Sequence, residues 1–232
     1  MSSCTAYPVI DFHTHFDRAN PLIVPENTIR VVSVPLAEAG LELPAGCIAT
    51  LELHPWSGAN WSSEFAAAAR RKEFAGIGEV GLDRLKGKLP LAEQMSIFSN
   101  AAELAKSLNK PLTIHCVKCF SELLQLYKSI KWQVPTIIHY FCGKLELAQQ
   151  LWRDTHFVLS LPPKIYSQQS LLDFLRDNPE YHTRIVLETD DPHHGDTEAH
   201  YRIMAQKLDI EFETLQKLMS EQFERLFNVR NI

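Results

Sequence analysis

The chain alternates short apolar runs rich in β-branched residues with longer stretches that repeat apolar residues at helical spacing. The short runs predict eight strands, at residues 8–15, 28–34, 46–55, 74–83, 111–117, 136–141, 156–162 and 184–190. The amphipathic stretches predict helices at residues 93–108, 121–131, 144–153 and 211–227. Strands that alternate with helices are typical of a parallel sheet with helical crossovers.

Eight such units predict an α/β fold of the TIM type, a (β/α)8 barrel formed by residues 1–232 as a single domain. Only residues 16–27 separate the first two predicted strands, and only residues 35–45 separate the next two. A parallel crossover needs about a dozen residues or more. We therefore expect an irregular barrel with short or missing helices after the first two strands.

The net charge of the chain limits the classes of binding partner that it can have. A formal net charge of −5 argues against a protein that binds polyanions through a broadly basic surface. It leaves open a nucleic-acid substrate held by bound cations, whose charge a residue count does not include. A content of 45% hydrophobic and 22% charged residues is that of an ordinary globular protein.

The sequence indicates a cytoplasmic protein. Its start has no basic segment followed by an apolar run, and no stretch approaches the ~20 apolar residues that span a membrane. The odd set of five cysteines favours free thiols in a reducing compartment: Cys4, Cys47, Cys116, Cys119 and Cys142. Cys116 and Cys119 form a C-x-x-C without a second pair, so we interpret the spacing as incidental. No pattern in the chain indicates an oligomeric state.

Histidines and carboxylates gather at the ends of the predicted strands. They are His13, His15, His54, Glu79, Asp83, His115, His139, Glu188 and Asp190. The carboxyl ends of the strands form the active-site face of a TIM barrel. Polar side chains this close to buried runs are costly unless they are paired or bound to metal. One strand-end histidine alone is more often structural, but their convergence from several strands predicts a divalent metal site.

Six segments, "DFHTHFD", "LELHPW", "IGEVGLD", "IHCVK", "IHYFCG" and "LETDDP", resemble the TatD-type metal-dependent hydrolases, TIM-barrel nucleases of the amidohydrolase superfamily. By this resemblance the metal ligands are His13, His15, Glu79, His115, His139 and Asp190. We expect two divalent ions, one held by His13, His15 and Asp190 and the other by His115 and His139, with Glu79 bridging. Mixed imidazole and carboxylate ligands suit Zn, Mn, Co or Mg.

The resemblance also suggests roles for single residues. Asp190 would orient or deprotonate the attacking water, and Glu79 would act with it in catalysis. Asp11 is expected to accept a hydrogen bond from a ligand imidazole. His54 either fixes the "HPW" turn or contacts a substrate phosphate, and the sequence leaves both open. In the loops, we expect contacts with substrate phosphates from Lys118, Lys144 and Lys164. We expect surface positions for His193 and His194.

The chain departs from the family pattern at two of these segments. Lys118 stands three positions after His115, where the family often has an arginine directly after the histidine. Cys142 replaces the serine that usually precedes the glycine of the sixth segment. These departures leave the expected ligand set complete and concern the part of the site that would face the substrate.

The leading hypothesis is a deoxyribonuclease that cleaves phosphodiester bonds of DNA ends or single strands, with DNA or another phosphodiester as its partner and no membrane. An alternative is hydrolysis of an ester, lactone or amide, as in other amidohydrolases. That superfamily often uses a bridging carboxylated lysine, and Glu79 on the fourth strand favours the nuclease branch instead. A third possibility is a barrel that serves as a subunit of a larger complex.

Overall fold

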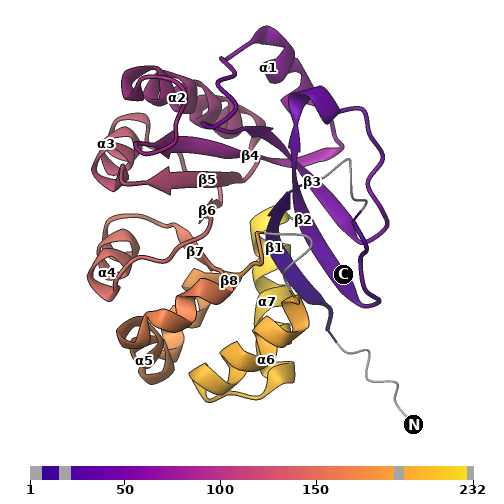
Figure 1. Ribbon diagram of the computed structural model, residues 1–232, viewed down its shortest axis with the longest axis vertical. Coiled ribbons are helices and arrows are strands. Elements are labelled where there is room, and N and C mark those ends of the chain that lie inside the picture. Colours follow the sequence, from indigo (N-terminus) through magenta and orange to yellow (C-terminus); the bar gives the residue numbers. More distant parts are fainter. Residues whose placement is uncertain (1–6, 16–21, 191–195, 229–232) are drawn as a thin grey trace.

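The computed structural model describes residues 7–15, 22–190 and 196–228. Eight strands form one sheet in which every neighbouring pair is parallel and the spatial order follows the chain (Figure 1). The strands are β1 (Val9–His15), β2 (Thr28–Pro35), β3 (Cys47–Leu53), β4 (Phe74–Asp83), β5 (Leu112–Val117), β6 (Thr136–Ile138), β7 (Val158–Leu161) and β8 (Ile185–Leu187). This order is that of a (β/α)8 barrel, as the sequence predicts.

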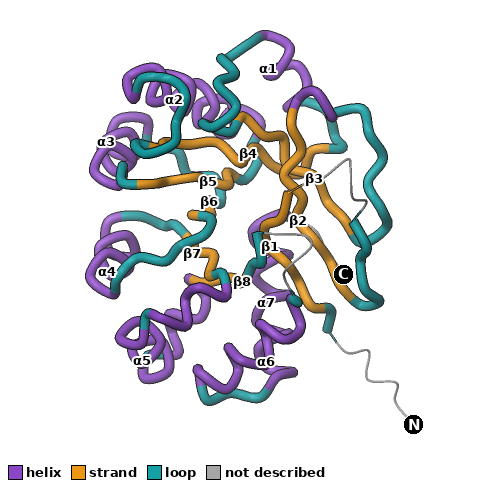
Figure 2. The backbone as a smooth tube through the Cα atoms, in the orientation of Figure 1, coloured by secondary structure: helices purple, strands orange, loops and turns teal. Residues whose placement is uncertain are grey.

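Helices surround the sheet over most of its circumference (Figure 2). The α-helices are α1 (Ser63–Ala69), α2 (Leu91–Leu108), α3 (Phe120–Ile130), α4 (Leu145–Asp154), α5 (Gln169–Asp177), α6 (Thr197–Leu208) and α7 (Phe212–Phe227). Short 3-10 helices are η1 (Leu36–Glu38), η2 (Pro163–Ser167) and η3 (Pro179–Arg184). None of the described helices is long and apolar enough to cross a lipid bilayer.

The first part of the barrel is irregular, as expected. Between β2 and β3 the chain forms only the three-residue η1 and then an extended loop, and residues 22–27 before β2 are not helical. Figure 2 shows loops beside β2 and β3 where helices cover the later strands. Short connections cannot hold a full crossover helix, so they leave this side of the sheet open.

The four predicted helices agree with α2, α3, α4 and α7 to within two residues at each end. The apolar faces of these helices pack into the core, as expected. For example, Phe98 of α2 and Met219 of α7 are fully buried. Three more helices, α1, α5 and α6, were not predicted. In α6 the polar residues Thr197 and His200 are themselves buried, so its inner face does not show a continuous apolar stripe.

The barrel closes between β1 and the segment that follows β8. Thr14 and Asp190 form a parallel bridge, and the backbone N–H of Asp190 donates to the carbonyl of His13 at 3.0 Å. The buried carboxylate of Asp11 accepts from the backbone N–H of Thr189 at 2.9 Å and from its hydroxyl at 2.5 Å. Closure therefore places Asp190 beside the two histidines of β1.

Three predicted strands extend too far. β3 ends at Leu53, β6 at Ile138 and β8 at Leu187, so His54, His139 and Asp190 lie in the turns beyond them. The backbone leaves the extended region there, since Tyr140 and Asp190 have φ of 49° and 66°. Left-handed conformations are uncommon for residues other than glycine, and they end strand pairing. The apolar residues around these positions do not indicate where the strands end.

β4 approaches β5 closely enough to require glycine. A Cβ atom on Gly81 would overlap the backbone of His115, and one on Gly78, whose φ is 134°, would overlap the backbone of Thr113. Glycine permits both the close contact and the positive φ. The glycines of "GEVGLD" thus bring Glu79 next to the histidine of β5.

Candidate metal centre

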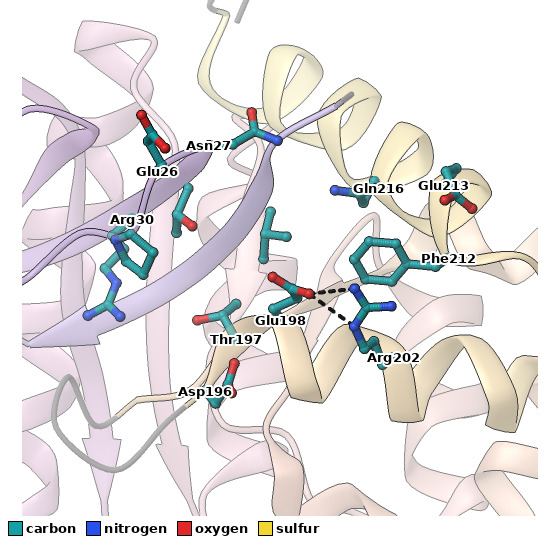
Figure 3. Close-up of a pocket in the computed structure, with 13 residues that line it drawn as sticks. Glu26, Asn27, Arg30, Asp196, Thr197, Glu198, Arg202, Phe212, Glu213 and Gln216 are labelled. Atoms are coloured by element: carbon teal, nitrogen blue, oxygen red, sulfur yellow. Dashed lines mark hydrogen bonds and ion pairs between the residues drawn. The ribbon is translucent and has the colours of Figure 1, made fainter. Parts of the chain in front are cut away.

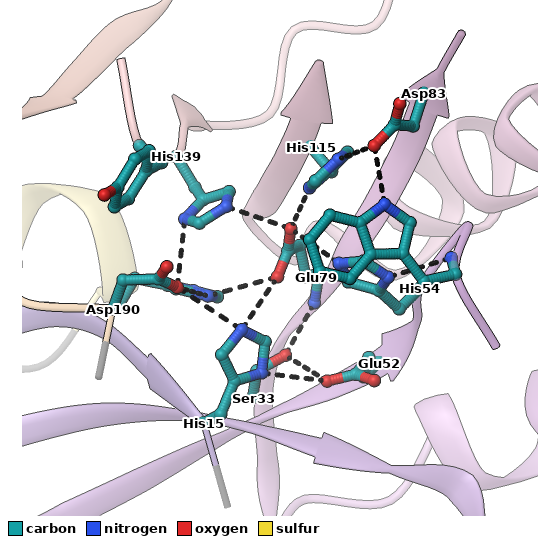
Figure 4. Close-up of polar contacts among 12 residues, drawn as sticks. His15, Ser33, Glu52, His54, Glu79, Asp83, His115, His139 and Asp190 are labelled. Carbon is teal, nitrogen blue, oxygen red and sulfur yellow. Dashed lines mark hydrogen bonds and ion pairs between the residues drawn. The ribbon is translucent and has the colours of Figure 1, made fainter. Parts of the chain in front are cut away.

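The six residues that the resemblance implies as ligands lie together at the carboxyl ends of the strands (Figure 4). They are His13 and His15 from β1, Glu79 from β4, His115 from β5, and His139 and Asp190 from the turns after β6 and β8. The side chain of Glu79 is fully buried, whereas those of His15 and Asp190 are 36% and 31% exposed. The group therefore has a buried centre and one side open to solvent.

Glu79 occupies the middle of the group, and its two oxygens face different histidines. Oε2 lies 3.2 Å from Nε2 of His13 and 3.3 Å from Nε2 of His15. Oε1 lies 3.0 Å from Nε2 of His139 and also contacts Nδ1 of His115. One carboxylate thus reaches both sets of imidazoles, which is the position that a bridging ligand requires.

Asp190 completes the β1 side of the group. Its Oδ1 lies 3.4 Å from Nε2 of His15 and 3.8 Å from Nε2 of His13. These three residues can each offer one atom such that all three atoms lie within 4.8 Å of one another, and the same holds for His13, Glu79 and His139. Atoms bound to a metal at ~2.1 Å stand roughly 3.0–3.4 Å apart in octahedral or tetrahedral geometry.

Buried polar atoms in this group lack hydrogen-bond partners within the described structure. They include both ring nitrogens of His13, Oε2 of Glu79 and Oδ1 of Asp190. Buried nitrogen and oxygen atoms are almost always bonded, so a convergent set without partners calls for a ligand. A divalent cation satisfies such a set, since every one of these atoms can donate a lone pair. The residues present therefore fit a metal ion.

Three of the histidines have their other ring nitrogen paired with a second carboxylate. The pairs are His15 Nδ1 with Glu52 at 3.4 Å, His115 Nε2 with Asp83 at 3.0 Å, and His139 Nδ1 with Glu188 at 3.2 Å. The His115–Asp83 contact is a hydrogen bond, and a hydrogen bond from a ring N–H to a carboxylate fixes the tautomer of the imidazole. In all three histidines the opposite nitrogen faces Glu79. Metal-binding histidines are typically held in this way.

These supporting carboxylates are themselves fixed by hydrogen bonds. Asp83 accepts from the indole N–H of Trp56 at 2.5 Å. Glu188 accepts from the backbone N–H of Tyr140 at 2.7 Å. Ser33 accepts from the backbone N–H of Glu79 at 2.9 Å and donates to Glu52 at 3.0 Å.

The roles of Ser33, Glu52, Asp83 and Glu188 were not predicted. Asp83 and Glu188 lie inside "IGEVGLD" and "LETDDP", which could have marked them as partners of the histidines. Glu52 stands in "LELHPW" but bonds a histidine of another strand, and nothing in the local sequence indicates which one. Ser33 lies in an apolar run with no polar pattern around it.

The charges of the group shift the pKa values of its members. Burial acts to raise the pKa of Glu79, but the charge of His139 and the close imidazoles of His115, His13 and His139 hold it well below its usual range. Burial lowers the pKa of His13, and the neighbouring His139 lowers it further. Burial disfavours the charge of His15, yet the nearby carboxylates of Asp190, Glu52 and Glu79 raise its pKa to about 12. The carboxylates thus stay ionised and stabilise positive charge among them.

His54 differs from the other histidines. Its Nδ1 accepts the backbone N–H of Trp56 at 3.0 Å, which is the turn-fixing bond that the sequence left open. A neutral ring that accepts at Nδ1 carries its proton on Nε2, which lies 3.1 Å from Oε1 of Glu79. A nitrogen that carries a proton does not bind metal, so we do not count His54 as a ligand although it lies near Glu79 and His115.

Asp11 does not have the contact that was predicted for it. Its carboxylate accepts from Thr189, from the hydroxyl of Thr197 at 3.3 Å and from the backbone N–H of His13 at 3.4 Å, and from no imidazole of the described residues. The prediction was wrong in the partner because side chains of Thr189 and Thr197, distant in sequence, take these positions. Burial raises the pKa of Asp11, although the bonds from Thr189 oppose this.

A cavity of about 790 Å³ opens onto the metal centre. It is lined on one side by His15, His54, Glu79, His115, His139 and Asp190. Lys118 and Lys164, two of the three lysines expected to meet phosphates, line it as well, together with the unpredicted Lys86, whereas Lys144 is not among its described lining residues. His193 and His194 lie outside the described residues. The position of the cavity fits the carboxyl-end active site of a TIM barrel.

A second cavity, of about 600 Å³, lies between the first residues of β1 and β2 and the helices α6 and α7 (Figure 3). Its charged side chains include Arg202, which bonds Glu198 at 3.0 Å and lies 4.4 Å from the ring centroid of Phe212. These groups satisfy one another, unlike the unpartnered atoms around Glu79. We therefore place the functional site at the first cavity.

Comparison with protein families agrees with the geometry. The family model described as "TatD related DNase" matches residues 10–228, nearly the entire chain. The chain belongs to this TatD-related DNase family. The match begins in β1, where His13 and His15 lie, and includes the segment after β8 with Asp190. The resemblance noted in the sequence is thereby confirmed.

Individual relatives of this TatD-family chain are distant. It is 29% identical over 155 residues to a protein named 3'-5' ssDNA/RNA exonuclease TatD from Klebsiella pneumoniae, covering 64% of this chain and 59% of that one. It is 26% identical over 184 residues to the metal-dependent hydrolase YabD of Bacillus subtilis, covering 73% and 70%. The matched part thus spans about three fifths of the length of the Klebsiella relative.

Solved structures share the fold. YJJV, a TatD homologue of Escherichia coli K12, superposes with a TM-score of 0.75 at 19% identity, covering 95% of this chain and 98% of that chain. At this identity the likeness concerns the barrel architecture alone. It agrees with the parallel order of eight strands in this TatD-family chain.

Proposed function

We infer that this TatD-family protein is a divalent-metal-dependent hydrolase that cleaves phosphodiester bonds, as a deoxyribonuclease acting on DNA ends or single strands. The observation that carries the proposal is the division of the Glu79 carboxylate between two sets of imidazoles, with Asp190 on the open side. Family membership and the nuclease name of the Klebsiella relative support the choice of a phosphodiester over other bonds.

Two divalent ions would be held by the ligands that the family resemblance implies. His13, His15 and Asp190, whose ligand atoms converge, would hold one ion. His115 and His139, which both contact Oε1 of Glu79, would hold the other, with Glu79 between the two ions. Such ions, when bound, polarise phosphate oxygens and lower the pKa of water. The ligand types suit Zn, Mn, Co or Mg. The bridging role of Glu79 is supported by its full burial among the imidazoles that its two oxygens contact.

Asp190 is suited to receive the proton of the attacking water. Burial acts to raise its pKa, but the close imidazole of His15 and the charges of His139 and His13 keep the pKa below the usual value, so the carboxylate is ionised. Its side chain remains 31% exposed on the cavity side of the cluster. An ionised, accessible carboxylate beside the reacting phosphate can orient water and accept its proton.

The remaining polar groups of the cavity would hold the substrate. The N–H on Nε2 of His54 can donate to a phosphate oxygen, because its other nitrogen is fixed by the backbone of Trp56. Lys118 and Lys164 line the same cavity with exposed side chains that can neutralise phosphate charge. The formal charge of −5 is then compatible with a nucleic-acid substrate, since positive charge is concentrated at one site.

We also assign the protein to the cytoplasm. The four cysteines in the described part of the chain, Cys47, Cys116, Cys119 and Cys142, are free thiols. Unpaired thiols are typical of a reducing compartment. Cys116 of the C-x-x-C also lines the cavity.

The proposal is tested by Asp190→Asn. This change keeps the shape of the side chain but removes its charge and its capacity to accept a proton. We expect hydrolysis of a labelled single-stranded oligonucleotide with Mn²⁺ to fall by about 10²–10⁴-fold. The circular dichroism spectrum and the thermal midpoint should show that the barrel still folds.

Two outcomes would contradict the proposal. Unchanged hydrolysis by Asp190→Asn would remove the role given to this residue. Cleavage of esters, lactones or amides under the same metals, without cleavage of phosphodiesters, would place the protein in the other branch of the amidohydrolases.

A further inference from the structure

Exposed apolar side chains gather at the mouth of the catalytic cavity. Trp56, Leu85 and Tyr140 are 41%, 68% and 38% exposed, and all three line this cavity. Large apolar side chains that share an exposed site are a mark of ligand binding. Two of the three are aromatic and stand at the edge of a site that already has a role in phosphodiester hydrolysis.

Trp56 is held rigidly beside the metal centre. Its indole N–H donates to Asp83 at 2.5 Å, which fixes the edge of the ring. Its ring lies edge-to-face with His54 and His115, at centroid distances of 4.9 Å and 5.6 Å. The ammonium of Lys86 lies 4.5 Å from the ring centroid, over the indole. A ring fixed in this way loses little conformational freedom when a planar ligand stacks on it.

Tyr140 stands on the other side of the centre. It follows β6, whereas Trp56 follows β3, and β4 and β5 with Glu79 and His115 lie between them in the sheet order. Its backbone N–H is fixed by Glu188, and its ring lies 5.8 Å from that of His139. The two aromatic side chains therefore border the reacting position from opposite sides.

Cations accompany the aromatic surface. Lys86, Lys118 and Lys164 line the same cavity as Trp56 and Tyr140. Stacking aromatics together with cations that follow the phosphates is the combination by which proteins bind unpaired nucleic-acid strands. The cavity, at about 790 Å³, lies within the ~300–1,000 Å³ of small-molecule sites, a size suited to a nucleotide.

We propose that Trp56 is a stacking platform for the unpaired base next to the scissile phosphate, with Tyr140 bordering the opposite side. This deepens the proposed function and rests on it. Every base has a π-face, so such a platform selects for the presence of an unpaired base and is tolerant of its identity. Such a platform would act on the single-stranded ends that the proposed function already takes as substrate.

The test compares two substrates that differ in one base. Both are single-stranded oligonucleotides with a label at the 5' end, and one carries an abasic residue in place of the 3'-terminal nucleotide. We expect the wild-type protein with Mn²⁺ to remove the base-bearing nucleotide roughly tenfold more efficiently in kcat/KM, the size expected for one stacked base. Equal efficiency on both substrates would overturn the proposal.

Two variants separate stacking from support of the metal centre. Trp56→Leu and Trp56→Phe both lose the N–H that bonds Asp83, but only Trp56→Phe keeps an aromatic face. We expect Trp56→Leu to lose the preference for the base-bearing substrate and Trp56→Phe to retain most of it. A preference that both variants lose equally would make Trp56 a positioning residue for Asp83 and would contradict stacking.

A binding measurement distinguishes failure of stacking from failure of hydrolysis. Fluorescence anisotropy of the same two oligonucleotides is measured with Asp190→Asn and Mn²⁺, which requires no cleavage. Tighter binding of the base-bearing strand supports the platform even where cleavage by the wild type is absent and the proposed function fails. Cleavage by the wild type without any difference in binding or rate between the two strands overturns the platform and leaves the proposed function standing.

Discussion

Histidines of two kinds surround Glu79. In His15, His115 and His139 one ring nitrogen lies within 3.4 Å of a supporting carboxylate, by a hydrogen bond in His115, and the other nitrogen faces Glu79, as in metal ligands. His54 instead accepts a backbone N–H and presents a proton. The second partner of each ring thus distinguishes a potential ligand from a potential phosphate donor. Residue type alone does not make this distinction.

His13 gives the sharpest test of the ligand assignment. It is fully buried with both ring nitrogens unpartnered, so we expect His13→Ala to lower metal affinity by at least about 100-fold, as measured by isothermal titration. Its neighbour Phe12 points to the other face of β1 and packs edge-to-face against Phe223 of α7. Phe12→Ala should therefore cost about 3–5 kcal/mol in urea unfolding, measured in chelator.

The two variants should show opposite effects. His13→Ala should lose metal and change the free energy of unfolding in chelator much less than Phe12→Ala does. If His13→Ala unfolds the barrel while metal affinity of the remaining folded protein is normal, His13 is a core residue and not a ligand.

Glu188 tests the carboxylate support of the ligands. It is fully buried and lies 3.2 Å from Nδ1 of His139. Glu188→Gln keeps the size of the side chain but weakens the hold on the imidazole N–H, and we expect metal affinity to fall about 10–100-fold. Glu198→Gln, at an exposed ion pair with Arg202, is the matched control and should leave affinity unchanged. Equal affinities for both variants would remove the supporting role of Glu188.

The sequence predicted the positions of the amphipathic helices and of the apolar strands. It did not predict where the strands end. Periodicity reports burial, so it locates α2, α3, α4 and α7 well. It misses α6, whose buried face contains Thr197 and His200. It also extends β6 and β8 too far, because the positive φ of Tyr140 and Asp190 is set by neighbouring strands and loops.

The buried histidine of α6 links that helix to β7 and η2. His200 bonds the carbonyl of Leu161 through Nε2 at 2.8 Å and the hydroxyl of Tyr166 through Nδ1 at 2.5 Å. Burial lowers its pKa from 6.5 to about 4, although the bond to Leu161 opposes the shift. The unfolded chain therefore binds a proton that the folded protein excludes between pH 6.5 and pH 4.

Stability should consequently fall as pH drops through this window, and His200 should account for part of the fall. Its contribution is fully present above pH 6.5, and roughly 2 kcal/mol of it is lost by pH 5. Urea unfolding at pH 7.5 and pH 5 measures the loss, and His200→Gln should show a loss smaller by about that amount. An identical loss in both proteins would show that His200 titrates normally in the fold.

At the scale of the whole barrel, the sequence predicted which residues form the candidate site better than it predicted which residues contact them. The six expected ligands converge because parallel strands place their carboxyl ends at one edge, a property of the fold that the strand pattern reveals. The partners of those ligands depend on distant contacts. Glu52 with His15 and Thr189 with Asp11 are pairs that only the closed barrel brings together.

The irregular side of the barrel does not disturb the geometry of the site, because strand pairing holds the side chains of the site in place. The described residues after β1 and β2 form no α-helix, yet β1, β2 and β3 supply His13, His15, Ser33, Glu52 and, just after β3, His54. The parallel pairing of β1, β2 and β3 and the closure at Thr14 and Asp190 hold these side chains in register. Loss of outer helices therefore leaves the inner geometry of the site intact.

Metal-dependent cleavage of a single strand tests the central claim most directly. The purified protein is stripped with a chelator and given a 5'-labelled single-stranded oligonucleotide, first alone and then with increasing Mn²⁺. The account predicts no cleavage without metal and stepwise release of nucleotides once metal is restored. Cleavage that persists in chelator, or a folded, metal-loaded protein that cleaves no phosphodiester with Mg, Mn, Co or Zn, would contradict it.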